Sequence, residues 1–393
     1  MGGRAGVEMG RPDMSPIPFA EIRAWMFEQA LPYWGGRGVD SEAGGFHEEL
    51  GLDGAATDIA FKRTRVICRQ IYVFSHAAIL GWAPGAILSA RGFDYLVAKA
   101  WLGPEQGWAG RLSRAGAVID ATPDLYDLAF VLFALAWRYK LAREPEVLRY
   151  AHLTLDFIRA RMRPDEGEGF LHKLPPSGPR LQNPHMHLLE AALAAFTATD
   201  DARFLDLADE LVGLFRARLF DGRVLREHFT ADWAPMPGAQ GRQAEPGHHF
   251  EWAWILAQYQ HIKATDMARE AAALVDFAER FGVDPATQAT FDQVRDDGAP
   301  LRQSSRTWPN TERIKGHLAL FELLARDPRA PVAGSARLLL DRYLAVSPRG
   351  AWIDQFDARG APLTKAAPAS TLYHLFLAFA EILRLETALT QTP

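Results

Sequence analysis

Apolar residues recur three and four positions apart along most of the chain, the spacing that places them on one face of an α-helix. One of the longest such stretches, LYDLAFVLFALAWRYKLA, covers residues 125–142. The pattern predicts a mostly helical chain, with helices over residues 19–34, 68–80, 125–142, 185–196, 204–220, 249–262, 316–325 and 372–385.

Short segments between the helices resemble one another. Each starts with an aromatic or aliphatic residue, alternates in polarity and ends in a turn rich in Gly, Asp or Pro, a pattern that predicts a small β-hairpin. Successive copies lie roughly 55–65 residues apart, as in repeat architectures. The six copies begin at Gly44, Gly107, Gly169, Arg223, Ala289 and Ala351.

Six copies with two helices each imply about twelve helices, arranged either as an open solenoid or as a closed ring. Neither end has an obvious polar capping unit, which an open solenoid needs. We therefore expect an all-α fold, an (α/α)6 barrel formed by residues 17–393 as a single domain. Residues 1–16, which are polar and Gly-rich, are expected to form a flexible tail. An ordinary multi-helix globule is the alternative.

Composition narrows the class of protein. Hydrophobic residues make up 48% of the 393, enough for a sizeable core. The net charge of −5 argues against a nucleic-acid-binding face, which is basic. Cys68 is the single cysteine, as is typical of a reducing compartment, and no apolar run reaches the roughly 20 residues of a membrane helix. We expect a soluble, cytoplasmic protein without nucleic-acid or membrane partners.

Two adjacent histidines begin one predicted helix, in the stretch PGHHFEWAW (246–254). His248 and Glu251 are three residues apart and therefore share a helical face. A carboxylate beside an imidazole fixes its tautomer and raises its basicity, which suits general acid–base catalysis. We therefore expect Glu251 to support His248. His249 points to a different face, and no chemistry is assigned to it.

The stretch QNPHMHLLEA (182–191) repeats this arrangement. His187 and Glu190 are again three residues apart, whereas His185 should face elsewhere. Asn183 precedes a proline and is expected to cap the helix.

Other polar residues lie in apolar helical surroundings. His374 and Arg69 would need partners if they are buried. Trp308, followed by Glu312, could form a platform on which a sugar ring stacks, and Tyr126 is a further candidate. Each residue alone has a packing explanation. Because polar residues recur at helix starts in several repeats, we predict one shared site at one end of the barrel.

Four motifs, PGHHFEWAWIL, NPHMHLLEA, WPNTE and LYH, together resemble the N-acylglucosamine 2-epimerase superfamily over residues 17–388. The family fold is an (α/α)6 barrel. The resemblance implies that His248 and His374 are the catalytic acid/base residues and that Glu251 supports His248. It also implies substrate-binding roles for Arg69, Tyr126, Asn183, His187, Trp308 and Glu312.

The residues of these motifs are more similar to those of mannose isomerases, and of proteins labelled mannose-6-phosphate isomerase, than to those of cellobiose 2-epimerases. The cellobiose enzymes carry paired tryptophans where this chain has Trp308. We expect an aldose–ketose isomerase that acts on a monosaccharide and interconverts D-mannose and D-fructose through a cis-enediol(ate). Two histidines suffice for such proton transfer, so no metal and no cofactor is expected.

Several alternatives stay open. They are a sugar 2-epimerase, a mannose-6-phosphate isomerase, a glycoside hydrolase using Glu251 and Glu312, a metal-dependent isomerase and a non-catalytic sugar-binding protein. The chain could act as a monomer or as a homodimer.

Overall fold

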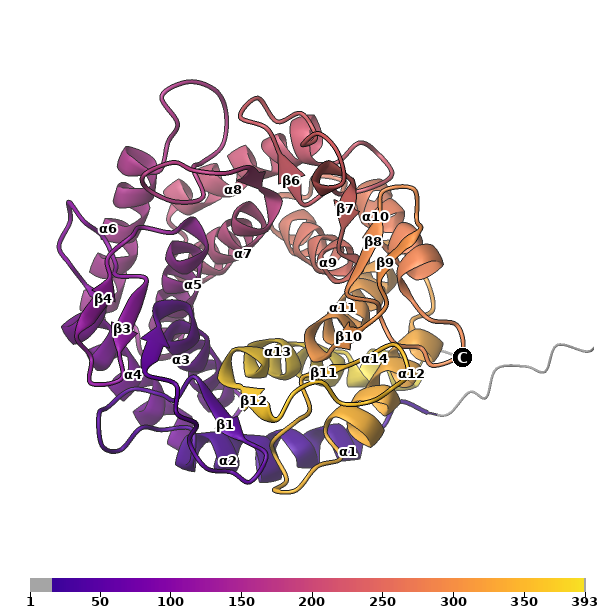
Figure 1. Cartoon of the computed structure of the whole chain (residues 1–393), viewed down its shortest axis with the longest axis horizontal. Coiled ribbons are helices and arrows are strands. Elements are labelled where there is room, and N and C mark those ends of the chain that lie inside the picture. Colours follow the sequence, from indigo (N-terminus) through magenta and orange to yellow (C-terminus); the bar gives the residue numbers. More distant parts are fainter. Residues whose placement is uncertain (1–15, 392–393) are drawn as a thin grey trace, which may run out of the picture.

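The computed structural model describes residues 16–391, so the tail expected over residues 1–16 lies outside the described residues except for its last position. Helices from all parts of this range form an inner ring around a common axis (Figure 1). They are α3 (Thr64–Ile79), α5 (Leu125–Ala142), α7 (Gln182–Thr199), α9 (Pro246–Lys263), α11 (Thr307–Leu324) and α13 (Leu372–Arg384).

An outer ring packs around the first. It consists of α1 (Phe19–Ala24) joined to α2 (Leu31–Gly36) by a π-helical turn (Trp25–Ala30), α4 (Pro84–Ala100), α6 (Pro145–Arg161), α8 (Ala202–Leu214) extended by a π-helical turn (Phe215–Leu219), α10 (Ala268–Gly282), and α12 (Arg329–Leu338) extended by another (Leu339–Tyr343). The short α14 (Glu386–Gln391) follows α13. The predicted all-α (α/α)6 barrel is therefore confirmed.

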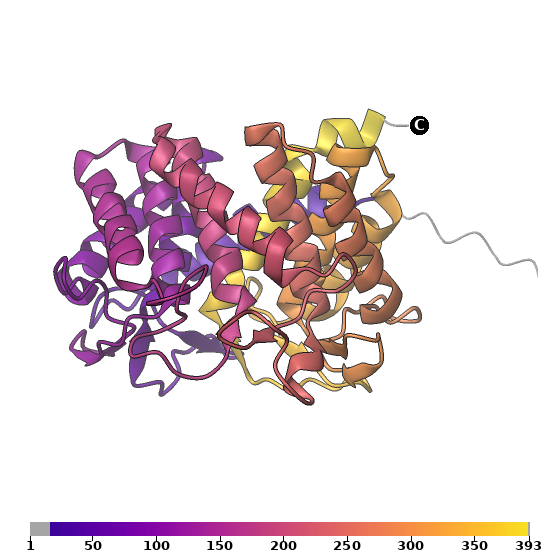
Figure 2. The ribbon, with the colours of Figure 1, turned by 90° about the horizontal axis from the view of Figure 1, so that it is seen from above.

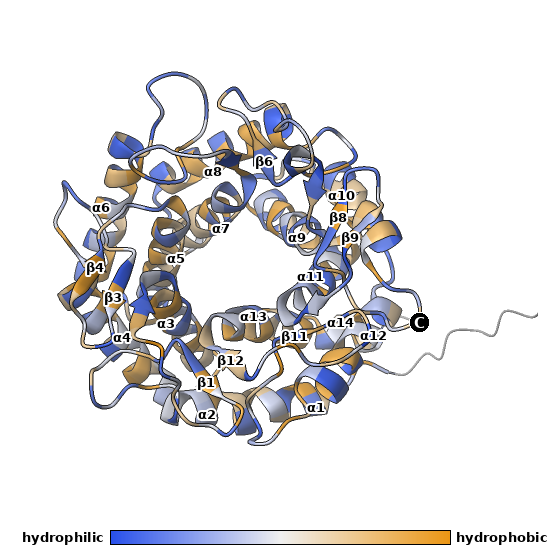
Figure 3. Ribbon diagram, viewed as in Figure 1, coloured by the Kyte–Doolittle hydropathy of each residue, from blue (hydrophilic) through white to orange (hydrophobic). Residues whose placement is uncertain are grey.

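The two rings differ in how they are buried. In α10 the buried residues include Ala271, Leu274, Val275 and Ala278, which form the single stripe of an amphipathic helix. In α5 buried residues occupy nearly every position from Leu125 to Ala136. In Figure 3 hydrophobic residues colour much of α5, whereas α10 shows both hydrophobic and hydrophilic residues.

Four inner helices begin earlier than their apolar pattern predicts: α3 at Thr64 rather than residue 68, α7 at Gln182 rather than 185, α9 at Pro246 rather than 249, and α11 at Thr307 rather than 316. Their first turns are rich in polar residues, which carry no apolar spacing. The outer helices α4, α6, α10 and α12 lie outside the predicted helical ranges.

Short strands occupy the loops at one end of the barrel, where each outer helix leads to the next inner helix (Figure 2). Two segments form the predicted hairpins, β3 (Arg111–Ser113) with β4 (Val118–Asp120) and β8 (Gln293–Arg295) with β9 (Pro300–Arg302). Three others close through isolated bridges such as Leu50 to Ala56. The segment from Gly169 forms no hairpin, because Pro175 and Pro176 have no N–H to donate to a partner strand.

Most strand pairs join neighbouring repeats. The strand before an inner helix pairs with the strand that follows the next outer helix. These pairs are β2 (Phe61–Arg63) with β3, β5 (Arg180–Leu181) with β6 (His228–Phe229), β7 (Gln243–Ala244) with β8, and β10 (Ser305–Arg306) with β11 (Gln355–Phe356).

The same rule closes the ring. The antiparallel pair β1 (Glu49–Gly51) and β12 (Ala366–Pro368) joins the first loop to the last, with Leu50 opposite Ala367. Trp34 stacks on Trp352 with ring centroids 4.9 Å apart, and its Nε1 donates to the Gly350 carbonyl at 3.0 Å. The first and last repeats therefore contact each other as neighbouring repeats do. Among residues 16–391, none of the helices has the length and apolar character needed to cross a membrane.

Candidate active site

The inner helices begin at the end of the barrel that carries the strands, and their first turns surround a cavity of about 470 Å³. Helix N-termini carry partial positive charge, so six of them around one space favour a group that becomes negative. The lining consists of Arg69, Tyr126, Leu181, Asn183, His187, Glu227, His228, Glu245, His248, Glu251, Arg306, Trp308, Asp354, Pro368, Ser370, Thr371 and His374.

Eight of the nine site residues predicted from the sequence line this cavity: Arg69, Tyr126, Asn183, His187, His248, Glu251, Trp308 and His374. The ninth, Glu312, does not. Its side chain is fully buried one turn below Trp308 and contacts His374 instead. The structure therefore places Glu312 behind His374 rather than in the cavity lining, and the substrate-binding role expected for it stays a prediction.

His248 is held by a carboxylate from another part of the chain. Its Nδ1 lies 3.0 Å from both carboxylate oxygens of Glu227, in the loop after α8. A carboxylate only accepts, so Nδ1–H donates to Glu227. Burial lowers the pKa of His248, but the Glu227 carboxylate more than offsets this and raises the pKa to about 9. His248 is therefore an imidazolium at neutral pH.

The expected pairing of Glu251 with His248 is wrong. Both Glu251 carboxylate oxygens lack a hydrogen-bond partner among the described residues, and the nearest imidazole nitrogen, His187 Nδ1, is 4.0 Å away. His248 and Glu251 share a helical face but do not pair, because Glu227 from the loop after α8 occupies the hydrogen-bonding position at His248 Nδ1. Burial, together with the carboxylates of Glu312 and Glu190, raises the pKa of Glu251 well above its usual range.

His374 has the opposite protonation state. Its Nδ1 lies 2.8 Å from Oε1 of Glu312. Burial, assisted by the positive charges of Arg69 and Lys315, lowers the pKa of His374 well below its usual value. The ring is neutral at neutral pH, and because Nδ1–H donates to Glu312, Nε2 keeps its lone pair.

Trp308 packs against both histidines. Its ring centroid is 5.0 Å from that of His248 and 5.5 Å from that of His374. The two imidazoles, which come from α9 and α13, thus lie at one cavity and near a single indole.

His187 pairs with Glu190 as predicted, with Nδ1 3.2 Å from Oε2. The hydroxyl of Tyr373 donates to the same carboxylate at 2.6 Å. Burial lowers the pKa of His187 to about 4, so this ring is also neutral.

Asn183 does not cap its helix. The helix α7 begins one residue earlier, at Gln182, and has no side-chain cap. The Oδ1 atom of Asn183 is instead buried without a partner among the described residues and lines the cavity, where a ligand could satisfy it.

Arg69 brings a positive charge to the cavity. Its guanidinium donates to the Tyr126 hydroxyl at 2.7 Å and to the Ser370 carbonyl at 3.2 Å, and it packs over the Phe130 ring. None of these partners is a carboxylate, so the charge of Arg69 is available to a developing anion.

His185 and His249 do not line the cavity, and their rings contact backbone groups instead. Both are the fourth residue of their helices and sit next to the carbonyl four residues earlier, at 2.8 and 2.9 Å. The Nε2 atom of each accepts a backbone N–H, from Phe170 and Leu225 respectively, at 3.0 Å. Each ring therefore fixes a loop to its helix.

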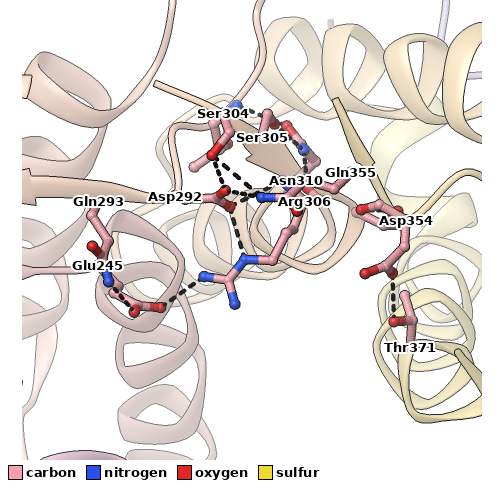
Figure 4. A network of polar contacts seen from close by, with 12 residues as sticks. Glu245, Asp292, Gln293, Ser304, Ser305, Arg306, Asn310, Asp354, Gln355 and Thr371 are labelled. Carbon is pink, nitrogen blue, oxygen red and sulfur yellow. Dashed lines mark hydrogen bonds and ion pairs between the residues drawn. The ribbon is translucent and has the colours of Figure 1, made fainter. Parts of the chain in front are cut away.

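A polar wall on the α11 side of the cavity was not anticipated (Figure 4). Arg306 donates to Asp292 at 2.9 Å and to Glu245 at 3.2 Å. Asp354 accepts from Thr371 at 2.7 Å, and burial raises the pKa of Asp354 to about 6. These residues lie in loops without helical periodicity, so no sequence pattern marks them.

Two trios of buried side chains lie close enough to share a cation, with ligand atoms within 4.8 Å: His187, Glu190 and Glu251, and Glu251, Glu312 and His374. The ammonium group of Lys315 already lies 2.7 Å from Glu312 in this cluster. Since the carboxylates have this counter-charge, we assign none of them as a metal ligand.

The whole chain is similar to known proteins. A family model described as N-acylglucosamine 2-epimerase (GlcNAc 2-epimerase) matches residues 44–378. A mannose-6-phosphate isomerase of Rhizobium meliloti (strain 1021) is 36% identical over 373 residues, covering 92% of this chain and 96% of its own. A D-mannose isomerase of Thermobifida fusca is 27% identical over 402 residues, covering 89% and 96%.

A solved structure of a D-mannose isomerase has the same fold, with a TM-score of 0.84 at 22% identity over 95% of this chain and 99% of that one. The family match spans the helices that build the cavity and ends four residues beyond His374. With its closed ring of helix pairs and its histidines around one cavity, the chain belongs to the N-acylglucosamine 2-epimerase family and is one of its sugar isomerases or epimerases.

Proposed function

We propose that the chain is an aldose–ketose isomerase that interconverts D-mannose and D-fructose through a cis-enediol(ate). The observation that carries the proposal is the opposite protonation of two histidines at one cavity. His248 is cationic beside Glu227, and His374 is neutral with Nε2 unpaired by its Glu312 contact. Such a pair supplies an acid and a base at the same pH.

In this scheme the open-chain aldose places C2 near Nε2 of His374, which takes the C2 proton. The electrons of the C–H bond form the C1=C2 double bond, and the carbonyl electrons move onto O1, which receives a proton from the His248 imidazolium. The neutral His248 then takes the O2 proton, and His374 returns its own proton to C1. The product is the 2-ketose, and both histidines regain their initial states.

The surroundings suit the negative charge that develops on O1. Arg69 and the N-termini of the inner helices place positive charge at the cavity. Asn183 and His187 offer polar atoms for substrate hydroxyls, and Trp308 offers an apolar face.

An uncharged sugar suits the lining better than a sugar phosphate. The cationic His248 is already paired with Glu227, and Arg69 is the cation of this lining whose hydrogen-bond partners are neutral groups. The charge of Arg306 is also paired with Asp292 and Glu245. The name of the Rhizobium meliloti relative nevertheless keeps mannose 6-phosphate as the second candidate substrate.

The glycoside hydrolase alternative required Glu251 and Glu312 on two sides of a glycosidic bond. Glu312 is fully buried outside the cavity lining, so this pair cannot flank a substrate.

The test is NMR in deuterated water with mannose, glucose, fructose, cellobiose and mannose 6-phosphate. We expect fructose to form from mannose with deuterium at C1, at an unchanged rate in EDTA. The variants His248→Ala and His374→Ala should lose at least about 100-fold in rate, the usual contribution of general acid–base catalysis, while remaining folded. Deuterated glucose from mannose would identify a 2-epimerase instead, and near-normal turnover by either variant would refute the histidine roles.

A further inference from the structure

A buried lysine lies beneath the cavity and has no task in the scheme above. Lys315 of α11 has no exposed side-chain surface, and its Nζ lies 2.7 Å from Oε2 of Glu312, which is also fully buried. The ammonium group also lies over the Trp254 ring, 4.3 Å from its centroid. Lysine is almost never fully buried unless it is paired, because removing an ammonium group from water costs several kcal/mol.

The ammonium group is surrounded by carboxylates. Burial lowers the pKa of Lys315, but the charges of Glu312, Glu251 and Glu190 more than offset it, so the side chain is cationic. The titratable and charged groups that face this cluster come from α3 (Arg69, Tyr72), α7 (His187, Glu190), α9 (His248, Glu251), α11 (Glu312) and α13 (Tyr373, His374, Glu381). Lys315 is the cation in closest contact with Glu312.

A continuous chain leads from Lys315 to the proposed base. One oxygen of Glu312 contacts Lys315 Nζ at 2.7 Å, and the other contacts His374 Nδ1 at 2.8 Å. An ionised carboxylate can only accept, which keeps the ring hydrogen on Nδ1 and the lone pair on Nε2. A protonated Glu312 could donate to Nδ1 instead, and the ring hydrogen would then sit on Nε2, which could no longer take a proton.

We propose that Lys315 is a positioning residue that keeps Glu312 an unprotonated acceptor and thereby holds His374 in the tautomer that can act as a base. The inference rests on the proposed role of His374. It assigns Lys315 no contact with substrate, since Lys315 does not line the cavity.

The electrostatics give the direction of the effect. Burial raises the pKa of Glu312, and Lys315 is the main opposing influence. Without the ammonium group, Glu312 would take up a proton from solvent at a higher pH than in the wild type. His374 would then lose its acceptor.

The test compares Lys315→Met with Lys315→Met/Glu312→Gln. At neutral pH the single variant should lose at least about 100-fold in kcat with KM changed less than about threefold, the scale of a lost general base. Its kcat should rise between neutral pH and about pH 9, as Glu312 ionises while His248 still holds its proton. In the double variant the side-chain amide that replaces the carboxylate can accept from Nδ1–H through its carbonyl oxygen at any pH, so kcat should recover at least about tenfold over the single variant.

Lys62→Met is the matched control. Lys62 is buried and paired with Asp40 at 2.9 Å, but it does not line the cavity. Its loss should lower stability without changing the pH profile of kcat.

The ¹⁵N shifts of the His374 ring report its tautomer without relying on turnover. We expect Nδ1–H in the wild type and Nε2–H in Lys315→Met. A folded Lys315→Met variant with the wild-type tautomer and pH profile would overturn the proposal. So would lost activity with neither an alkaline rise nor rescue by Glu312→Gln. Absence of C2 exchange in the wild type would instead contradict the proposed function, and the tautomer would still decide the role of Lys315.

Discussion

His248 and His374 line the same cavity but differ in protonation, because a different carboxylate contacts each ring. The carboxylate behind His248, Glu227, is hydrogen-bonded to Gln182 and, among residues 16–391, has no lysine or arginine as a hydrogen-bonding partner, so its charge acts on the imidazole. The carboxylate behind His374, Glu312, shares its charge with Lys315. Burial therefore keeps His374 neutral, because the carboxylate of Glu312 stabilises a positive charge on this ring less than Glu227 stabilises one on His248.

Glu227→Gln tests this difference at the residue scale. The pKa of His248 is raised above its usual value, to about 9, so the protonated form persists below that pH and is lost as the pH rises through it. If His248 is the acid, kcat/KM of the wild type should fall near pH 9. Without the Glu227 charge the falling limb should move down by about one unit or more, the size of a lost neighbouring charge.

Folding stability should follow the same sign. The stabilisation from protonated His248 is fully present below its unfolded pKa and is lost as the pH rises towards 9. Glu48→Gln is the control, since Glu48 is a buried carboxylate paired with Arg63 and does not line the cavity. A wild-type falling limb that stays in place in Glu227→Gln would contradict the assignment.

At the scale of the helices, the contact between α9 and α11 positions the Trp308 indole. A Cβ on Gly247 of α9 would lie 2.5 Å from Cζ3 of Trp308, and one on Gly316 of α11 would lie 2.9 Å from Cδ1 of Phe250. The two helices approach closely because each presents a glycine to an aromatic ring. Trp308 therefore packs directly against the first turn that carries His248.

Gly247→Ala should push the Trp308 indole out of this position. We expect KM for mannose to rise several-fold, since the methyl group and the indole cannot occupy the same space. Gly92→Ala, in the outer helix α4, creates a similar overlap with Ile71 and Phe46 away from the cavity. That control should lower the melting temperature and leave KM unchanged. Equal KM in both variants would show that the indole does not contact substrate.

At the scale of the whole molecule, the cavity depends on a closed ring. The pair β1–β12 and the Trp34–Trp352 stack connect residues that are more than 300 positions apart. The six helix starts come from all parts of the chain, and these contacts join the first repeat to the last around the cavity that they surround.

Leu50→Ala tests the closure. Leu50 is fully buried in β1, so the truncation should cost about 2–5 kcal/mol of unfolding free energy, as for other core leucines. Denaturant unfolding measures this cost. Below the transition, the activity of the folded fraction should stay within about twofold of the wild type, because Leu50 does not line the cavity. A stability loss below about 1 kcal/mol would indicate that the seam contributes little.

The sequence alone determined the features that repeat or that lie within one helix. Apolar spacing predicted the inner helices and, of the outer ones, α1–α2 and α8. The recurring turns predicted six units and closure, and the His187–Glu190 pair followed from residues three positions apart. These features were predictable because helical geometry fixes which side chains share a face.

Only the tertiary structure decided which groups meet across the ring. The partner of His248 is Glu227 from a loop rather than Glu251 from its own helix, and Glu312 supports His374 from below the cavity. No sequence pattern marks Lys315 or the polar wall on the α11 side of the cavity. Contacts between residues far apart in sequence depend on how helices and loops pack around the axis, and periodicity within one helix carries no information about that packing.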